Sequence, residues 1–421
     1  MPAAFDRESL SSVLWWARSH QPALGLLYAS AKLRRGLLGD RQQIAMVVGS
    51  YGKTTTTRAT RAVLGLPSNP WSETNPNTLG EVAWSILREG AWRGHAVAEV
   101  GIAAPGQMAR YAKILRPHTT IVTWIGHEHV RAFGDVLALR DQKADAVRCL
   151  PKTGTAILNA DDAQVRWMAS QTGAHVMWYG TSPDCDVWAD DIQLEWPTGM
   201  RFVLRTRERA SVVQTRLLGR RSVHNLLAAA AAGLNAGIPW ESIVSRLEAL
   251  PPTRSRLQPI RLTSGAIMIR DEYKATPETV GEAIRLLTDV PAQRRVVVCG
   301  DLNNLPSVPV EPHYERIGSS IAAVADLVLV VGTALSKYLP GLRAGGMSDH
   351  RILEAEGVHE AIALLRGELR VGDVVLLKGF EDERLSRIAL ALSGTNVQCR
   401  RSSCTAYLQF CDDCPLLSKA A

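Results

Sequence analysis

The sequence predicts two α/β domains in tandem. Strand-like and helical patterns alternate from Ile44 to about Leu250, and they alternate again from Ala266 to Leu392. This alternation is typical of mostly parallel sheets covered by helices on both faces. Between the two series, Pro251-Pro252-Thr253 punctuates the chain and predicts a domain boundary. We therefore expect a helical segment (1–43), a central domain (44–252), a C-terminal Rossmann-like α/β domain (253–395) and a cysteine-rich tail (396–421).

Composition bounds the class of protein. At 421 residues the chain is long enough for two or three domains, and 46% hydrophobic with 21% charged residues is ordinary for a globular protein. The net charge of +7 favours anionic partners such as nucleotides or acidic metabolites. No nucleic-acid recognition signature is present, and no apolar run reaches the length of a membrane span. Because Asp6 and Glu8 stand where a signal peptide needs basic residues, we expect a cytoplasmic protein.

Residues 1–43 contain two helical patterns, and the second carries Lys32, Arg34 and Arg35. A basic amphipathic segment with tryptophans can lie on a membrane surface. It can also pack on its own domain, and that interpretation is favoured. The sequence leaves the oligomeric state open.

A glycine-rich turn lies between the apolar run Ile44–Val48 and a helical pattern from Thr55 to about Leu64. Such a turn presents backbone N–H groups at a helix N-terminus, which is a phosphate site. In this P-loop, Lys53 is expected to reach the β- and γ-phosphates and Thr54 to ligate Mg²⁺. Val47 stands where the strict motif has glycine. The predicted nucleotide-binding residues are Gly49, Ser50, Tyr51, Gly52, Lys53, Thr54 and Thr55.

Further elements of the central domain follow in order. Predicted strands are Ala96–Val100, Thr119–Ile125 and Thr155–Asn159, and predicted helices are Leu79–Leu87, Pro105–Leu115, Val136–Arg148 and His224–Gly237. Between Asp186 and Leu218 the pattern changes to short alternating strands, which predicts an antiparallel patch added to the sheet.

The C-terminal domain shows the same alternation without the G-x-G-x-x-G fingerprint of dinucleotide-binding folds. Its predicted strands are Ala266–Arg270, Arg295–Cys299, Leu327–Val331 and Val374–Leu377, and its predicted helices are Thr279–Leu287, Tyr314–Val324, His359–Leu365 and Glu383–Leu392.

Glu99 and His129 follow two of the predicted strands of the central domain. Ligands of open α/β sheets collect at the carboxyl ends of strands, so both side chains can face the P-loop. A carboxylate and an imidazole there would supply Mg²⁺ ligands beside a triphosphate. Each residue taken alone could instead be a helix cap or a surface residue.

The motifs together resemble the Mur ligase family, and most closely the branch that ligates UDP-N-acetylmuramoyl-tripeptide to D-alanyl-D-alanine. The resemblance spans about residues 44–395 in collinear order. It is carried by Gly49–Thr55, Asn75–Gly80, Glu99–Gly101, Ile125–His129, Lys143, Asn159–Asp162, Gly219–Asn225, Arg256–Leu257, Asp271–Pro277, Gly300–Asp301, His313–Gly318 and Lys378–Gly379. It implies an ATP-dependent ligase that activates a carboxylate as an acyl phosphate, which an amine then attacks.

The resemblance also implies residue roles. Thr54 with Glu99 would hold one Mg²⁺, and His129 would hold a second, near Lys143 in its carbamylated form. Lys53 would bind the triphosphate, so that Lys53, Lys143, His129 and Asp271 form the implied catalytic set. From the matched positions, Asn225 is expected near the adenine, and Arg256 and Asp271 at the γ-phosphate and ribose.

Departures from the family pattern concern the substrate more than ATP. Arg221-Ser222 replaces the usual His-Asn pair, and Trp124 stands where many members have asparagine. The 43 residues before the central domain are too few for a UDP-sugar-binding domain, so we expect a small-molecule carboxylate other than UDP-muramoyl peptide and an amino-acid or peptide acceptor. The alternatives are a D-Ala-D-Ala-adding ligase of peptidoglycan synthesis and a non-catalytic partner subunit. Since Lys53, Glu99, His129 and Lys143 are all present, an enzyme is favoured.

The sequence contains seven cysteines. Of these, Cys149, Cys185 and Cys299 are expected to be buried thiols. The remaining ones form the pattern C-x4-C-x6-C-x2-C: Cys399, Cys404, Cys411 and Cys414. Four thiolates can enclose a structural Zn²⁺, and C-x2-C is a common half of such sites. Free thiols or a redox pair in the tail are the alternatives.

Overall fold

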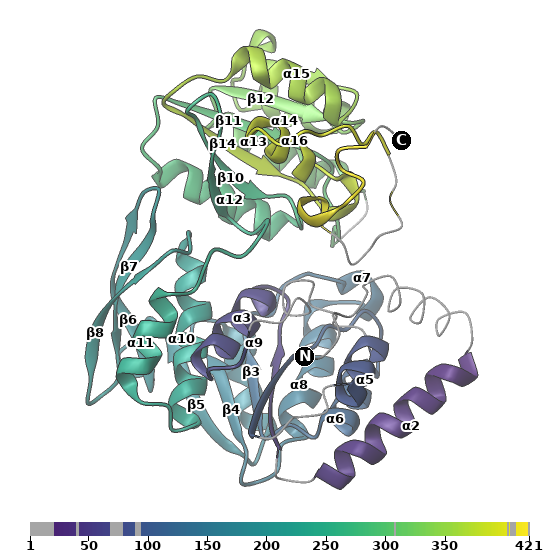
Figure 1. The fold of residues 1–421 in the computed structure, drawn as a ribbon, viewed down its shortest axis with the longest axis vertical. Coiled ribbons are helices and arrows are strands. Elements are labelled where there is room, and N and C mark those ends of the chain that lie inside the picture. Colours follow the sequence, from purple (N-terminus) through teal and green to yellow (C-terminus); the bar gives the residue numbers. More distant parts are fainter. Residues whose placement is uncertain are drawn as a thin grey trace. The chain divides into compact units, whose positions relative to one another are not determined.

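A computed structural model describes residues 21–38, 42–67, 79–88, 94–306, 309–401, 404 and 410–419. The chain forms two compact units, each with a mixed α/β composition (Figure 1). One unit contains the chain up to Asp191, with Phe202–Val213 and Arg221–Ala249; the other takes Ile192–Arg201, Gln214–Arg220 and the chain from Leu250 onward. The predicted fold class, a P-loop unit with a mostly parallel sheet and a second Rossmann-like α/β unit, is confirmed.

The first sheet has eight strands in the order β2-β1-β3-β4-β5-β6-β7-β8. Their bounds are β1 Gln42–Val48, β2 Gly94–Glu99, β3 Thr119–Val122, β4 Thr155–Asn159, β5 His175–Gly180, β6 Val187–Glu195, β7 Gly199–Arg205 and β8 Ala210–Thr215. The strands from β2 through β6 pair in parallel. The connections β6–β7 and β7–β8 are too short for parallel crossovers, which agrees with the antiparallel patch that the sequence predicts. Strand β5 was not among the predicted strands.

The helices of this unit cover the parallel strands. They are α2 Gln21–Leu38, α3 Lys53–Val63, α5 Leu79–Arg88, α6 Gln107–Leu115, α7 Val130–Phe133, α8 Val136–Arg148, α9 Ala163–Met168, α10 Arg220–Asn235 and α11 Trp240–Glu248, with a short 3₁₀ turn at Ala169–Gln171. One continuous core joins side chains of α2, α5, α6, α8 and α9 to β1–β4. Strand β1 is therefore buried between β2 and β3, and it ends where the glycine-rich turn begins.

Helix α2 packs on its own unit, beside α5 and α6 (Figure 1). The buried Arg35 side chain donates to the carbonyl oxygens of Leu115 (2.8 Å) and Arg116 (3.2 Å), at the end of α6. Arg34 donates to the carbonyl of Leu87 at 3.0 Å. Two of the basic residues thus satisfy carbonyl groups at helix ends, where cations are favoured. None of the helices in the described part of the chain is both long and apolar enough to cross a membrane.

The second unit has a six-stranded sheet in the order β13-β12-β11-β14-β10-β9. Only β9 runs antiparallel to its neighbour. The strands are β9 Gln258–Arg261, β10 Ile267–Asp271, β11 Arg294–Cys299, β12 Leu327–Val331, β13 Ile352–Ala355 and β14 Asp373–Lys378. The helices are α12 Pro277–Asp289, α13 Glu311–Ala322, α14 Leu335–Ala344, α15 Val358–Glu368 and α16 Ser386–Leu392, with 3₁₀ turns at Asp349–Arg351, Glu381–Glu383 and Cys411–Asp413.

Buried side chains on both faces explain why these strands appear in the sequence as continuous apolar runs. On β11, Val297 and Cys299 face a core shared with α12–α14, whereas Val296 and Val298 face a core shared with α15 and α16. A sheet between two helical layers needs apolar residues at every strand position. The short strands β9 and β13 and the helix α14 were not predicted.

Candidate functional site

Two glycines shape the turn between β1 and α3. Gly49 and Gly52 have φ angles of 150° and 80°, in the region that favours glycine. A Cβ on Gly49 would lie 2.0 Å from Thr123 Oγ1, and a Cβ on Gly52 would lie 2.4 Å from Asn225 Oδ1. Any larger residue would therefore push the turn away from its neighbours. The turn leads directly into the N-terminus of α3, where the helix dipole favours an anion.

Lys53, the first residue of α3, is held back onto the turn. Its Nζ donates to the carbonyl oxygens of Gly49 (3.0 Å) and Ser50 (3.2 Å). It also lies 3.5 Å from the Glu128 carboxylate, and Glu128 in turn lies 3.4 Å from His129 Nε2. The lysine ammonium thus has a buried carboxylate partner that the sequence did not identify. The run His127-Glu128-His129 is visible in the sequence, but sequence spacing alone does not show which of its three side chains faces the loop.

The predicted metal ligands lie on different elements around the glycine turn. Thr54 Oγ1 lies 3.4 Å from Glu99 Oε1, and Glu99 is buried at the end of β2. The buried Lys143, on α8, donates from Nζ to Ser50 Oγ at 3.0 Å. A hydroxyl and a carboxylate are hard oxygen donors, which fits Mg²⁺. Among the described residues, no three His, Cys, Asp or Glu side chains are arranged to hold a metal by themselves. Mg²⁺ bound with phosphate oxygens and waters needs fewer protein ligands.

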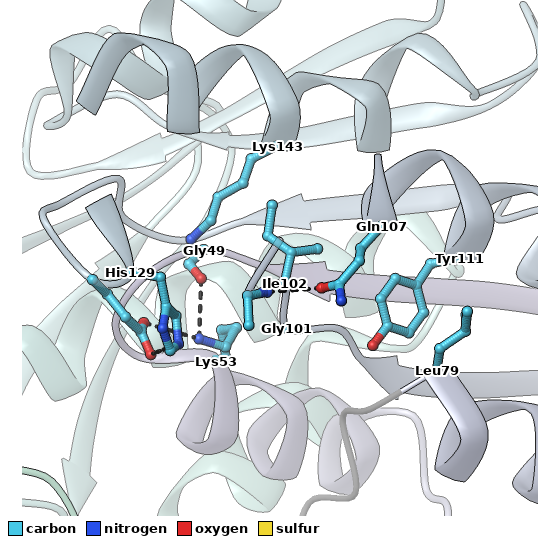
Figure 2. Close-up of a pocket in the computed structure, with 11 residues that line it drawn as sticks. Gly49, Lys53, Leu79, Gly101, Ile102, Gln107, Tyr111, His129 and Lys143 are labelled. Carbon is cyan, nitrogen blue, oxygen red and sulfur yellow. Dashed lines mark hydrogen bonds and ion pairs between the residues drawn. The ribbon is translucent and has the colours of Figure 1, made fainter. Parts of the chain in front are cut away.

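A pocket of about 170 Å³ opens beside the turn. Four predicted site residues line it, namely Gly49, Lys53, His129 and Lys143, together with Leu79, Gly101, Ile102, Ala103, Gln107, Tyr111 and Glu128. Figure 2 shows Lys53 and Lys143 approaching Gly49 from two sides, with Gln107 and Tyr111 further along the pocket. Charged groups of both signs therefore converge at one end, and amide, phenol and aliphatic groups line the other.

Asn225 lies beneath the turn rather than on the pocket wall. Its Oδ1 accepts a hydrogen bond from Thr56 Oγ1 at 3.2 Å, and the side chain contacts Gly52 closely. Asn225 on α10 thus supports the turn from a position 169 residues later in the chain.

An aromatic and cationic group lies next to Asn225. The Arg221 guanidinium stands 5.8 Å from the centre of the Tyr51 ring and 5.5 Å from that of Trp124. The Trp124 ring lies 5.1 Å from His224, whose Nε2 is 2.7 Å from Asp161. Burial by itself would raise the pKa of Asp161, but hydrogen bonds from His224 and Thr181 outweigh this effect and lower the pKa. The sequence identifies Trp124 and Arg221 only as departures from the family pattern, because their contact depends on the fold.

The remaining predicted residues, Arg256 and Asp271, gather in the second unit. Asp271 ends β10, and its carboxylate lies 2.5 Å from Lys378 Nζ at the end of β14. Burial raises the pKa of Asp271 and lowers that of Lys378, while the attraction between them opposes both shifts. The Arg256 guanidinium lies over the Tyr273 ring at 4.3 Å, and Leu257 donates its N–H to Asp271. The predicted site residues therefore form two groups, one in each unit.

The tail cysteines Cys399, Cys404, Cys411 and Cys414 line a pocket of their own in the second unit. All seven cysteines of the chain are free thiols. Two expectations lie outside the described residues: the first helical pattern of residues 1–20, and the part of the family motif at Asn75–Thr78.

Comparisons with known proteins agree with this geometry. The Mur ligase middle domain matches residues 47–233, and the Mur ligase glutamate ligase domain matches residues 255–380. A UDP-N-acetylmuramoyl-tripeptide–D-alanyl-D-alanine ligase of Mycobacterium bovis is 31% identical, covering 87% of this chain and 77% of the relative. The Escherichia coli protein of the same name is 27% identical, covering 83% and 76%.

Solved structures show the same fold. A crystal structure of MurF from Acinetobacter baumannii has a TM-score of 0.77 at 24% identity, covering 88% of this chain and 80% of that one. MurF ligase from Thermotoga maritima in complex with ADP has a TM-score of 0.76 at 20% identity, covering 88% and 83%. With two family domains matched in order, the chain belongs to the Mur ligase family of ATP-dependent amide-forming ligases.

Proposed function

We propose that this protein joins a small-molecule carboxylate to an amino acid or peptide amine through an acyl-phosphate intermediate. The observation that carries the proposal is the pocket beside the glycine turn, where Lys53, Lys143, Glu128 and His129 converge next to a helix N-terminus. Such a site fits a triphosphate, because phosphoryl transfer depends mainly on positioning and charge neutralisation. The Thermotoga maritima relative, solved with ADP, supports a nucleotide in this fold.

The chemistry proceeds in two balanced steps. In the first, a carboxylate oxygen attacks the γ-phosphorus, a C–O–P linkage forms, the bond to the β-phosphate oxygen breaks and ADP leaves. In the second, the amine nitrogen attacks the acyl carbon, phosphate leaves with its oxygen, and the nitrogen loses a proton. Lys53 would orient the β- and γ-phosphates and offset their charge in the first step. The loop N–H groups would hold the same oxygens.

Metal ions would bind at Thr54 with Glu99 and at His129, and when bound they neutralise charge on the transferred phosphoryl group. The hard oxygen donors of Thr54 and Glu99, 3.4 Å apart, fit the first of these ions. We further propose that Lys143 is carbamylated. Addition of CO₂ to its neutral amine would release a proton and place a carboxylate-like group in the pocket that His129 also lines. Asn225, Arg256 and Asp271 remain the proposed contacts to adenine, γ-phosphate and ribose.

The carboxylate substrate is proposed to differ from UDP-muramoyl peptide. Support comes from Arg221 and Trp124, two departures from the family pattern that meet beside Tyr51 of the turn. The names of the mycobacterial and Escherichia coli relatives favour a second candidate, ligation of UDP-N-acetylmuramoyl-tripeptide to D-alanyl-D-alanine. Both candidates consume ATP, which supports a cytoplasmic place of action.

A substrate screen with the purified protein and Mg·ATP tests both candidates. Phosphate release is measured with UDP-N-acetylmuramoyl-tripeptide plus D-alanyl-D-alanine and, separately, with panels of small carboxylates and amino acids or dipeptides. Mass spectrometry follows every positive pair. We expect phosphate release only when both substrates are present, with one phosphate released per molecule of product. The mass of the product should equal the sum of the two substrate masses minus one water. Efficient turnover of the muramoyl pair would instead establish the second candidate. ATP hydrolysis unaffected by any acceptor would contradict ligation altogether.

A further inference from the structure

The four tail cysteines line the same pocket although they are spread over sixteen residues of the sequence. They line one pocket with Arg384, Arg387, Arg401, Leu416 and Leu417. Cys399 and Cys411 are buried, and Cys404 and Cys414 are half-buried. This pocket is separate in its lining residues from the pocket beside the glycine turn. The clustering therefore needs an explanation other than the ligation site.

Backbone hydrogen bonds, rather than disulfides, bring these cysteines together. The N–H of Cys414 donates to the carbonyl of Cys411 at 3.2 Å, which closes a tight turn over the C-x2-C pair. The N–H groups of Gln398 and Cys399 both donate to the carbonyl of Leu417, at 2.8 and 3.0 Å. The end of the tail thus folds back beside Cys399. Both cysteines of this turn line the pocket, and their C-x2-C spacing is one that structural zinc sites use.

Two buried arginines enclose the cysteines. Arg384 donates to the carbonyl of Cys404 at 3.3 Å, and Arg387 donates to the carbonyls of Cys399 (3.4 Å) and Arg401 (2.8 Å). Both side chains are at most 4% exposed, yet within the described chain their buried Nε atoms have no hydrogen-bond partner. A buried donor left without an acceptor is costly and asks for an explanation. Metal-bound thiolate sulfurs are acceptors of such N–H groups.

We propose that Cys399, Cys404, Cys411 and Cys414 bind one Zn²⁺ as a closed, tetrahedral, structural site. Four thiolates around Zn²⁺ carry a net negative charge, and the guanidinium groups of Arg384, Arg387 and Arg401 offset it. Among the described residues no three His, Cys, Asp or Glu side chains are already arranged to hold a metal. Zinc binding would therefore have to draw the four thiols inward, to Zn–S distances of about 2.3 Å. Metal binding of this kind supplies folding free energy to the segment that carries the ligands.

The proposed zinc site would fix a segment that contacts the β10 region. Asp412, between the two knuckle cysteines, accepts hydrogen bonds from the buried Arg270 at 2.6 and 3.1 Å. Asp413 accepts one from Arg254 at 2.6 Å, and the Phe410 ring lies 6.0 Å from that of Tyr273. Arg270 immediately precedes Asp271, and Arg254 lies two residues before Arg256. The metal would therefore hold the tail against the loop and strand that carry these two proposed nucleotide contacts.

Metal analysis of the full chain tests the proposal. Protein purified in reductant and without chelators is expected to contain about one zinc per chain by elemental mass spectrometry. Replacement of the metal by Co²⁺ should give the visible and ultraviolet bands of a tetrahedral cobalt thiolate. A chain without zinc that also gives no such bands would overturn the site. Stoichiometric iron with acid-labile sulfide would also overturn it, in favour of an iron–sulfur cluster, and so would a disulfide found by mass spectrometry.

Matched variants separate the site from the other thiols. Cys414→Ser should lower zinc content at least about tenfold and increase amide hydrogen exchange over residues 254–273. The control is Cys149→Ser, because that thiol lies outside the cluster, burial raises its pKa to about 12, and it donates to the carbonyl of Ala146 within its own helix turn. The control variant should keep the zinc content and the amide hydrogen exchange of the wild-type chain. Unchanged zinc in Cys414→Ser would overturn the four-cysteine assignment. If that variant does not fold, the cobalt spectrum of the wild-type chain decides.

Discussion

Lys53 illustrates how a single residue depends on its surroundings. Its ammonium group is held by two loop carbonyls and the buried Glu128, so the site provides countercharge before any phosphate arrives. A phosphate group would compete with Glu128 for the same cation. The lysine is thus kept at the turn, at the first position of α3.

We predict that Lys53→Ala lowers ligase turnover at least about 100-fold, because it removes a cation from the transferred phosphoryl group. Circular dichroism should show an unchanged fold. Lys113→Ala, at an exposed position of α6, is the control and should keep full activity. Phosphate release near the wild-type rate in Lys53→Ala would show that the nucleotide lies elsewhere.

A second residue-scale prediction concerns Lys143. Lys143→Ala should lose turnover about 100-fold, and small carboxylates such as formate or acetate should restore part of it, because they replace the proposed carbamate. Lys152→Ala removes an exposed lysine just after the same helix and should change nothing. Steady-state kinetics with and without added carboxylate measure both effects. Wild-type kinetics in Lys143→Ala would remove this residue from the mechanism.

At the scale of elements, helix caps hold the strand ends that carry the site. Asp162 caps α9 by accepting from the N–H of Gln164 at 2.7 Å. Its second oxygen accepts from the N–H of Ile125 at 2.7 Å, just before the segment that leads to His129. Asp135 caps α8 through Ala138 at 2.7 Å and is the simpler case, at an exposed position. Asp135 thus caps a helix, whereas Asp162 caps a helix and also holds the backbone at Ile125. Comparing the two residues therefore distinguishes the effect of losing a cap from the effect of losing this second contact.

Asp162→Ala should lower the free energy of unfolding by about 2–3 kcal/mol, since a lost cap costs about 1 kcal/mol and an unsatisfied buried N–H adds a comparable amount. Asp135→Ala should cost only about 1 kcal/mol. Urea unfolding of each variant measures these differences. We also expect a lower kcat in Asp162→Ala alone, because the Ile125–His129 segment loses its anchor. Equal activity in both variants would contradict the positioning role.

At the scale of the whole molecule, one buried carboxyl group makes the stability of the second unit depend on pH. Burial raises the pKa of Glu383 from 4.5 to about 7, although its carboxylate accepts hydrogen bonds from the N–H groups of Asp301 (2.6 Å) and Phe380 (3.0 Å). Because the folded chain then holds a proton that the unfolded chain releases, stability falls as pH rises from 4.5 to 7. Above pH 7 this group adds no further change.

Calorimetry between pH 5 and 8 should therefore show a falling melting temperature for the transition of the second unit. The expected loss is about 1–3 kcal/mol, since each pKa unit corresponds to about 1.4 kcal/mol. Glu383→Gln should remove most of this slope, whereas Glu315→Gln, at an exposed position of α13, should leave it unchanged. A slope that persists in Glu383→Gln would assign the pH effect to other groups.

Much of this architecture was predictable from sequence because local chemistry determines it. The apolar run before Gly49, the Gly-Lys-Thr turn and the helix after it require only neighbouring residues, and they form β1 and α3 as expected. Helix α8 has the predicted bounds, Val136–Arg148. Strand β5 and strand β9 escaped prediction, because most of their residues are only partly buried and give weaker apolar patterns than fully buried strands.

The sequence by itself determined the turn, the order of the family motifs and the two α/β series, since each is encoded within short stretches. Only the tertiary structure decided that Glu128 pairs with Lys53, that Arg221 meets Trp124, and that Arg270 binds Asp412. These partners lie 75 to 142 residues apart in sequence. No local periodicity encodes such distances. They are set by which strand ends meet at one edge of a sheet and by which helix or tail segment packs against that edge.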